Sequence, residues 1–232
     1  MCEIITDRNR AILPACTEDH IKKITIPWDK PTDYIPDHYI SIDPGGRDQT
    51  AILYAYYDYL EGTLVIDDED VIDSASTEDI HKCIGKKLEG EWAGIKPHRI
   101  IMDNNNLILV KDMQKLHGMS VKATKKDKKE AQVNHTNLLL AKEEIVINPR
   151  CKSLIQQCRF GIWNKTRTSY ERTAALSHCD TVDALVYLVR NISRSRNPIE
   201  IKPYDRGTHV YLGKEQEDTS GFKGIKKLFT RR

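Results

Sequence analysis

The sequence contains few aromatic residues, no long apolar run and no closely spaced cysteine pair. Aromatic side chains make up 7% of the 232 residues, and only three of them are phenylalanine. No apolar stretch approaches the roughly 18 residues that a membrane-spanning helix requires, and no secretory leader pattern opens the chain. With 30% charged and 39% apolar residues, the composition is typical of a soluble globular protein, and we expect no membrane partner.

The cysteines are scattered, and none of them forms a C-x-x-C motif. Zinc sites and thiol redox motifs use such closely spaced pairs, so the spacing argues against a zinc site. Since disulfides are rare in the cytosol, we expect reduced thiols in a cytosolic protein. The six cysteines are Cys2, Cys16, Cys83, Cys151, Cys158 and Cys179.

The formal net charge is only +2, so no global basic field indicates a nucleic-acid partner. Basic residues are instead concentrated in two places. One is the last stretch, from Lys223 to Arg232, which holds five basic residues and no acidic one. The other is a lysine-rich segment with Lys122, Lys125, Lys126, Lys128 and Lys129. Such patches can contact phosphates, although a solvated loop is the commoner role of a lysine run.

The order of apolar patterns predicts a mixed sheet flanked by helices. Three β-prone runs with short connections should form an antiparallel meander, and shorter runs follow; the predicted strands are 39–43, 50–57, 63–67, 99–103, 118–123 and 144–147. Ser76 or Thr77 is a fair N-cap for the first helix. Helical spacing predicts helices at 77–88, 107–116, 130–142, 153–160 and 178–191. A meander followed by crossover strands fits the α/β ribonuclease H-like fold.

Three regions follow from this pattern. Residues 1–36 lack strong periodicity, and we expect them to form a lead-in segment that wraps the domain. Residues 37–195 form the α/β domain. Residues 196–232 form a basic C-terminal tail with several glycines and prolines, which either lacks order or docks on a partner.

Four aspartates lie at positions where a ligand-binding site is expected. Asp43 and Asp103 each end a predicted strand, and a right-handed crossover would place these two strands side by side in parallel. Ligands of open α/β sheets bind at such carboxyl ends. Asp180 and Asp183 lie three residues apart on the last helix, roughly 60° apart around its axis, on one flank of its apolar stripe.

Carboxylates that meet in one place repel one another unless a cation joins them. Four of them would suit Mg²⁺ or Mn²⁺, and two such ions can activate water and stabilise the leaving oxygen of a phosphodiester. Each aspartate alone has a simpler interpretation. A strand-end aspartate is usually a turn or cap residue, and Asp180 could favour the helix dipole. Asp183 lies too deep in the helix for capping, and a charge beside an apolar run requires a partner.

An ordered set of short motifs resembles the nuclease domain of the large terminase subunit of tailed bacteriophages, a ribonuclease H-like family. The last motif resembles the H-D-D-x-x-D-A-L helix start of that family, with Cys179 in place of the middle acid. The opening, from Cys2 to Pro14, resembles the segment that follows the family's ATPase domain. The resemblance covers about residues 1–195, and its motifs are ISIDPGG at 40–46, RIIMD at 99–103, INPRCK at 147–152 and HCDTVDAL at 178–185.

The resemblance implies a two-metal endonuclease that cuts concatemeric viral double-stranded DNA during packaging. By position, Asp43, Asp103 and Asp183 would be metal ligands, and Asp180 a fourth ligand or a proton-handling group. It also implies an ATPase domain, a small terminase subunit and a portal as partners, in the cytoplasm of the infected bacterial host. Because this sequence lacks the family's G-x-x-x-x-G-K-[ST] motif, we expect no ATPase in this chain and interpret it as a nuclease domain separated from its motor.

The remaining candidate residues each have two interpretations. His178 supports the metal site or handles a proton, or it is an ordinary residue near the helix start. The candidates for contacts with the DNA backbone, which are otherwise solvated, are Lys125, Lys126, Lys128, Lys129, Arg167 and Arg172. Two other functions stay open: a Holliday-junction resolvase or other ribonuclease H-like nuclease, and a non-catalytic module that binds DNA or the portal.

Overall fold

The computed structural model describes residues 8–28, 31, 34–45, 48–104, 107–173, 176 and 178–194. Its strands are β1 (Asp37–Asp43), β2 (Gln49–Asp58), β3 (Thr63–Asp73), β4 (Arg99–Asp103), β5 (Val121–Thr124) and β6 (Ile145–Ile147). Its helices are α1 (Glu18–Ile24), α2 (Thr77–Glu89), α3 (Leu107–Lys115), α4 (Lys129–Ala141), α5 (Lys152–Phe160) and α6 (Asp180–Asn191), and a 3-10 turn spans Arg8–Arg10. Among these described helices, none has the length and apolar character to cross a membrane.

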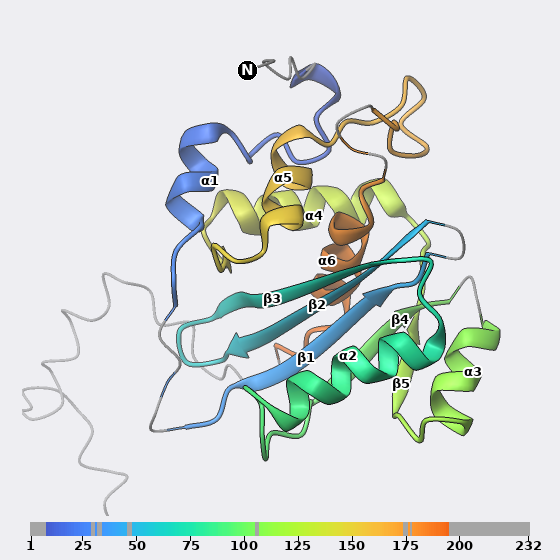
Figure 1. The fold of residues 1–232 in the computed structure, drawn as a ribbon. Helices are drawn as coiled ribbons and strands as arrows, with labels where there is room; N and C mark the ends of the chain where they lie inside the picture. Colours follow the sequence, from blue (N-terminus) through green and yellow to red (C-terminus); the bar gives the residue numbers. More distant parts are fainter. Residues whose placement is uncertain are drawn as a thin grey trace, which may run out of the picture. The chain divides into compact units, whose positions relative to one another are not determined.

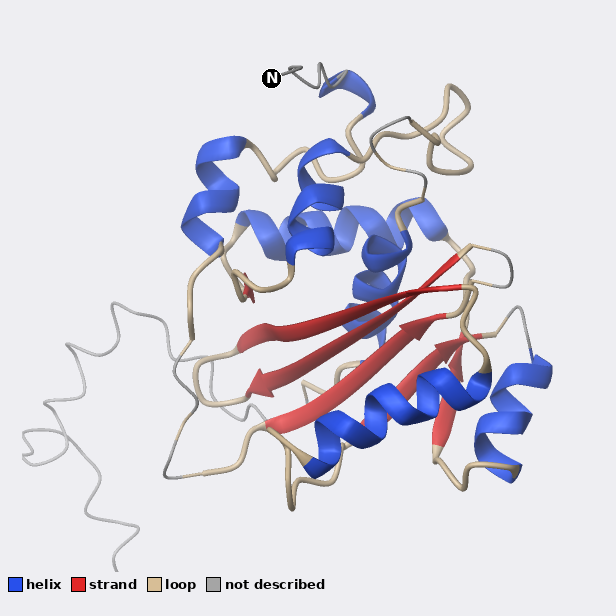
Figure 2. Ribbon diagram, viewed as in Figure 1, coloured by secondary structure: helices blue, strands red, loops and turns tan. Residues whose placement is uncertain are grey.

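One mixed sheet runs through the domain, with the strand order β5-β4-β1-β2-β3-β6 (Figures 1 and 2). β1, β2 and β3 form the antiparallel meander that the sequence predicts. β4 lies parallel to β1, as the crossover argument predicts. β5 pairs in parallel with β4, and β6 pairs in parallel with β3, so both edges of the sheet are formed by short parallel strands.

Successive residues of β1 point to opposite faces of the sheet, and each face is covered by its own core. Ile40 and Ile42 belong to the core beneath α2 and α3, together with Trp92 and Met113. Tyr39 belongs to the core on the other face, where α1, α4, α5 and α6 lie (Figure 1). All seven residues of β1 are buried, which makes it a central strand with helices on both sides.

Helix α6 packs over β1, β2 and β4, and hydrogen bonds fix it at both ends. The Ser41 hydroxyl donates to the carbonyl of Ala184 at 2.7 Å. Arg99 Nη1 donates to the carbonyl of Asn191, also at 2.7 Å. The first bond holds the start of α6 over the carboxyl end of β1, and the second holds its end over the start of β4.

The first turn of α6 is capped from another helix. Cys179 stands at the N-cap and makes no side-chain capping bond. Instead, Oε1 of the buried Gln157 on α5 accepts hydrogen bonds from the Thr181 N–H at 3.0 Å, the Thr181 hydroxyl at 2.6 Å and the Val182 N–H at 3.4 Å. Because Gln157 satisfies these donors, Asp180 and Asp183 are not required as caps.

Part of the predicted lead-in belongs to the domain core. Ile12 and Leu13 are buried, and α1, with Thr17 as its N-cap, buries Ile21 and Ile24. The sequence did not predict α1, because its seven residues are too few for a clear helical pattern. The predicted tail at 196–232 lies outside the described residues.

The other predicted elements are present, and most of them begin and end within two residues of the predicted bounds; β3 and β5 differ by more. β3 continues as one strand to Asp73, beyond the predicted end at 67, across a register shift in its pairing with β2. β5 begins at Val121 and not at 118. Gly118 adopts a φ of 64°, a left-handed conformation that strands do not accommodate, so the chain turns there first.

Replacing Gln157 with alanine should lower the free energy of unfolding by about 1 to 3 kcal/mol, because the buried Thr181 donors would lose their acceptor. The control is Gln156→Ala, at the exposed neighbouring position of α5, which should change stability by less than about 0.5 kcal/mol. Denaturant unfolding followed by circular dichroism measures both. Equal stabilities of the two variants would show that this cap contributes nothing.

Candidate metal centre

Asp43 and Asp103 lie at the carboxyl ends of neighbouring parallel strands. The register aligns Ile42 of β1 with Met102 of β4, so the next residue of each strand is an aspartate beside the other. Side chains two apart on a strand share a face. Asp43 therefore lies on the same face as Ser41, which contacts α6. Both strand-end acids are in place as the sequence predicts.

The start of α6 adds Asp180 and Asp183 to the same site. Asp43, Asp103 and Asp180 are only 4% to 9% exposed, and the side chain of Asp183 is 15% exposed. The negative charges of Asp183, Asp180 and Asp103 all act on Asp43. The structure therefore brings the four predicted carboxylates together, from β1, β4 and α6.

Among the four carboxylates, Asp43 shows most clearly how its neighbours change a pKa. Its pKa is raised well above the usual range, first because burial disfavours the charged form and then because Asp183, Asp180 and Asp103 repel it. The positive charge of Lys126 opposes this shift. Each additional cation near these oxygens would favour the ionised form in the same way.

His178 lies between two carboxylates at the outer side of the site. Its Nε2 is 3.2 Å from Oδ2 of Asp48, and its Nδ1 is 3.4 Å from Oδ1 of Asp180. Burial, and then the charges of Asp183 and Asp48, raise the pKa of Asp180 to about 6, while His178 opposes the shift. Sequence reasoning missed Asp48. The only signal was its place in the polar turn that leaves the carboxyl end of β1.

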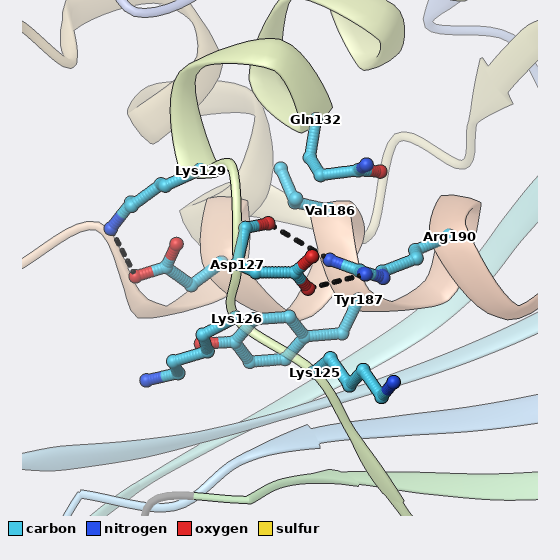
Figure 3. A pocket seen from close by; sticks show the side chains of 9 residues that line it. Lys125, Lys126, Asp127, Lys129, Gln132, Val186, Tyr187 and Arg190 are labelled. Carbon is cyan, nitrogen blue, oxygen red and sulfur yellow. Dashed lines mark hydrogen bonds and ion pairs between the residues drawn. The ribbon is translucent and has the colours of Figure 1, made fainter.

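Two residues of the lysine-rich segment lie against the acids. Lys126 Nζ is 2.6 Å from Oδ2 of Asp103, and Lys129 Nζ is 3.1 Å from Oδ2 of Asp183. Figure 3 shows Lys129 directed at a carboxylate of α6, with the segment crossing that helix. Two of the four carboxylates are thus paired with ammonium groups of the chain itself.

The other residues that are predicted to contact DNA lie further from the carboxylates. Lys125 and Lys128 are exposed, and Lys125 lines the small pocket drawn in Figure 3. Arg172 Nη2 is 3.4 Å from Oδ2 of Asp48, at the rim. Arg167 does not reach the acids in this way, since its Nη1 lies 3.7 Å from a carboxylate oxygen of Glu130 on α4.

Cys179, which replaces an acid of the resembled motif, lies outside the carboxylate set. Its side chain is buried in the core that also holds Ile12. Burial, and then the charges of Asp183 and Asp180, raise the pKa of this thiol to about 12. Because only the thiolate is a good metal ligand, a thiol protonated at neutral pH leaves metal binding to the carboxylates.

The carboxylates fit a hard divalent cation by their chemistry. Oxygen ligands are those that Mg²⁺ and Mn²⁺ prefer, and Oδ2 of Asp180 is buried without a hydrogen-bond partner among the described residues. Within the described part of the chain, no three acidic, histidine or cysteine side chains already have the spacing of a metal site. Binding would therefore require the carboxylates to close around the ion.

The sheet order, with its antiparallel meander and added parallel strands, is the ribonuclease H-like arrangement predicted from the sequence. No protein-family model matches the sequence, and no curated protein is significantly similar to it. Solved structures do share the fold.

One similar structure is a large terminase from a thermophilic bacteriophage, with a TM-score of 0.63 and 19% identity over 78% of this chain; the match spans only 44% of that longer terminase chain. A second is the large terminase nuclease from the thermophilic phage G20c, with a TM-score of 0.56 and 15% identity over 79% of this chain and 100% of that one. A third is the g2p (large terminase) nuclease domain from the bacteriophage SPP1 with bound Mn, with a TM-score of 0.50 and 19% identity over 76% of this chain and 92% of that one. At these identities the similarity establishes the fold.

In the absence of metal, Asp180→Asn should be more stable than the wild type at about pH 7.5, by about 1 to 2 kcal/mol after allowance for partial solvent exposure. The pKa of Asp180 is raised to about 6, so the ionised carboxylate destabilises the fold above that pH. As the pH falls, the folded protein binds a proton before the unfolded chain does, and the two stabilities should converge by about pH 4.

Denaturant unfolding in EDTA across this pH range measures the difference. Asp79→Asn is a control in which the change in stability should have the opposite sign, because hydrogen bonds from the Ser76 hydroxyl and N–H lower the pKa of Asp79. That variant should be less stable than the wild type near neutral pH. A stability difference for Asp180→Asn that does not change with pH would contradict the assignment of a buried, repelled carboxylate.

Proposed function

We propose that the chain is the metal-dependent DNA endonuclease domain of a viral packaging terminase large subunit, which cuts concatemeric double-stranded DNA. The observation that carries this proposal is the convergence of Asp43, Asp103, Asp180 and Asp183 at the carboxyl ends of β1 and β4 in a ribonuclease H-like sheet. The similarity of fold to the three terminase structures supports it. The SPP1 domain has bound Mn, and the G20c nuclease has a structure with bound magnesium.

Two Mg²⁺ or Mn²⁺ ions held by the carboxylates would activate a water molecule and stabilise the leaving oxygen of the phosphodiester. The chain's contribution is position and charge. Asp43 and Asp103 are positioned by the central strands that they end, and Asp183 approaches them from α6, which hydrogen bonds hold at both ends. His178 contacts Asp180, where it orients the carboxylate and can carry a proton.

The DNA backbone would lie along the basic residues beside the acids. Lys125, Lys128 and Arg172 are exposed at the rim, so they can pair with phosphates without breaking a buried contact. Lys126 and Lys129 can reach phosphates only after leaving Asp103 and Asp183. Arg167, on the same loop as Arg172, would contact DNA further from the cut.

The proposed partners beyond DNA are those of a packaging motor. We place ATP hydrolysis in a separate domain, because this sequence has no phosphate-binding loop motif. That ATPase domain, a small terminase subunit and a portal would work with the nuclease in the cytoplasm of the infected bacterial host.

The purified chain should nick and linearise plasmid DNA in Mn²⁺, and less rapidly in Mg²⁺, with little sequence preference. Asp43→Asn and Asp183→Asn should each reduce the rate by at least about 100-fold, because each removes a charged ligand from a preorganised site. Agarose gel electrophoresis of timed reactions measures the rates, and circular dichroism verifies that the variants fold.

Asp112→Asn is the matched control, since it removes one carboxylate from α3 and should keep the wild-type rate. Cutting by Asp183→Asn at the wild-type rate would contradict the ligand assignment.

A four-way DNA junction in the same assay separates the two nuclease functions, because faster cleavage of the junction than of linear duplex would indicate a resolvase.

A further inference from the structure

Each of the two lysines that pair with the aspartates of the site is held on two sides. Lys129 Nζ, 3.1 Å from Asp183, also lies 3.7 Å from the centre of the Tyr170 ring. Lys126 Nζ, 2.6 Å from Asp103, lies 5.4 Å from the centre of the Tyr187 ring. A carboxylate on one side and an aromatic face on the other is a favourable setting for a cation. The two ammonium groups therefore occupy formed cation sites and are not loosely solvated.

The segment that carries these lysines is tied down between them. Asp127 Oδ1 accepts a hydrogen bond from Arg190 Nη2 at 2.6 Å, and the Asp127 carbonyl accepts one from Arg190 Nη1 at 3.0 Å (Figure 3). Lys128 has a φ of 56°, which is unusual for a residue other than glycine. The tie to α6 keeps Lys126 and Lys129 at the acids.

We propose that residues 125–129 act as a lysine latch, in which Lys126 and Lys129 are internal counter-ions that must leave the carboxylates before divalent metal can bind there. The inference rests on the proposed function in one respect, namely that these carboxylates are the metal ligands. It adds a regulatory contact within the chain, made by residues otherwise considered only for DNA binding.

The physical reason is competition for the same oxygens. An ammonium group 2.6 Å from Oδ2 of Asp103 occupies a ligand position of that oxygen, and its charge repels an approaching divalent cation. Once released, the lysines remain next to the site because Asp127 and Arg190 hold their segment. Phosphates of bound DNA can then become their partners. DNA binding and metal loading would therefore assist each other, and Asp103 and Asp183 would stay paired with the lysines while no DNA is bound.

Mn²⁺ binding to the purified chain without DNA, measured by isothermal titration calorimetry, tests the latch. Lys126→Met and Lys129→Met should each bind Mn²⁺ about fivefold more tightly than the wild type, since no ion pair has to be broken. Lys142→Met is the matched control. It also removes a lysine paired with a glutamate, Glu144 at 3.9 Å, but at the far end of α4, and its affinity should stay within about twofold of the wild type.

Arg190→Gln loosens the segment without removing either lysine, and it should also tighten Mn²⁺ binding. It supplies the test if a lysine variant fails to fold, as judged by circular dichroism. If the wild type binds Mn²⁺ and the folded variants bind it with equal or weaker affinity, the latch is overturned while the proposed metal site stands. If neither the wild type nor any variant binds Mn²⁺, the proposed metal site fails, and the latch with it.

Discussion

The repulsion among four carboxylates, three of them buried, is the constraint on which the site depends. Asp43 shows it most clearly, because burial and three neighbouring acids raise its pKa. A fold selected only for stability would avoid this arrangement, since buried charges of one sign are costly without a cation. In this protein Lys126 and Lys129 supply positive charge from within the chain, and the rest of the structure can be understood as the support that keeps the acids together despite the repulsion.

That support comes from contacts that connect distant parts of the sequence. Ser41 binds the backbone of α6, and Gln157 of α5 caps its first turn. Together they place the start of α6 over the end of β1. The cap matters for the chemistry as well as for stability, because a helix start that is already satisfied leaves the carboxylates of Asp180 and Asp183 for the site. These contacts are made by buried polar groups, which would be costly to leave unpaired.

Most of the elements, though not α1, and the positions of the four acids could be predicted because their signals are local. The apolar runs that end at Asp43 and Asp103 indicate buried strands, and the parallel pairing of those strands follows from the handedness of crossovers. The partners of the lysines could not be predicted in this way. Lys129 and Asp183 are 54 residues apart, and a lysine run looks the same in a solvated loop as in an ion pair. Gln157 and Asp48 were missed for the same reason, since each acts through a contact that only the folded chain creates.

The acids of β1, β4 and α6 are proposed to form a divalent metal site. Anomalous diffraction from crystals of this chain soaked in Mn²⁺ tests it most directly, because manganese is located without reference to activity. We expect anomalous peaks among the carboxylates of Asp43, Asp103, Asp180 and Asp183, with Lys126 and Lys129 displaced from the carboxylate oxygens that they now contact. Manganese bound elsewhere, with both lysines still paired to the acids, would contradict it.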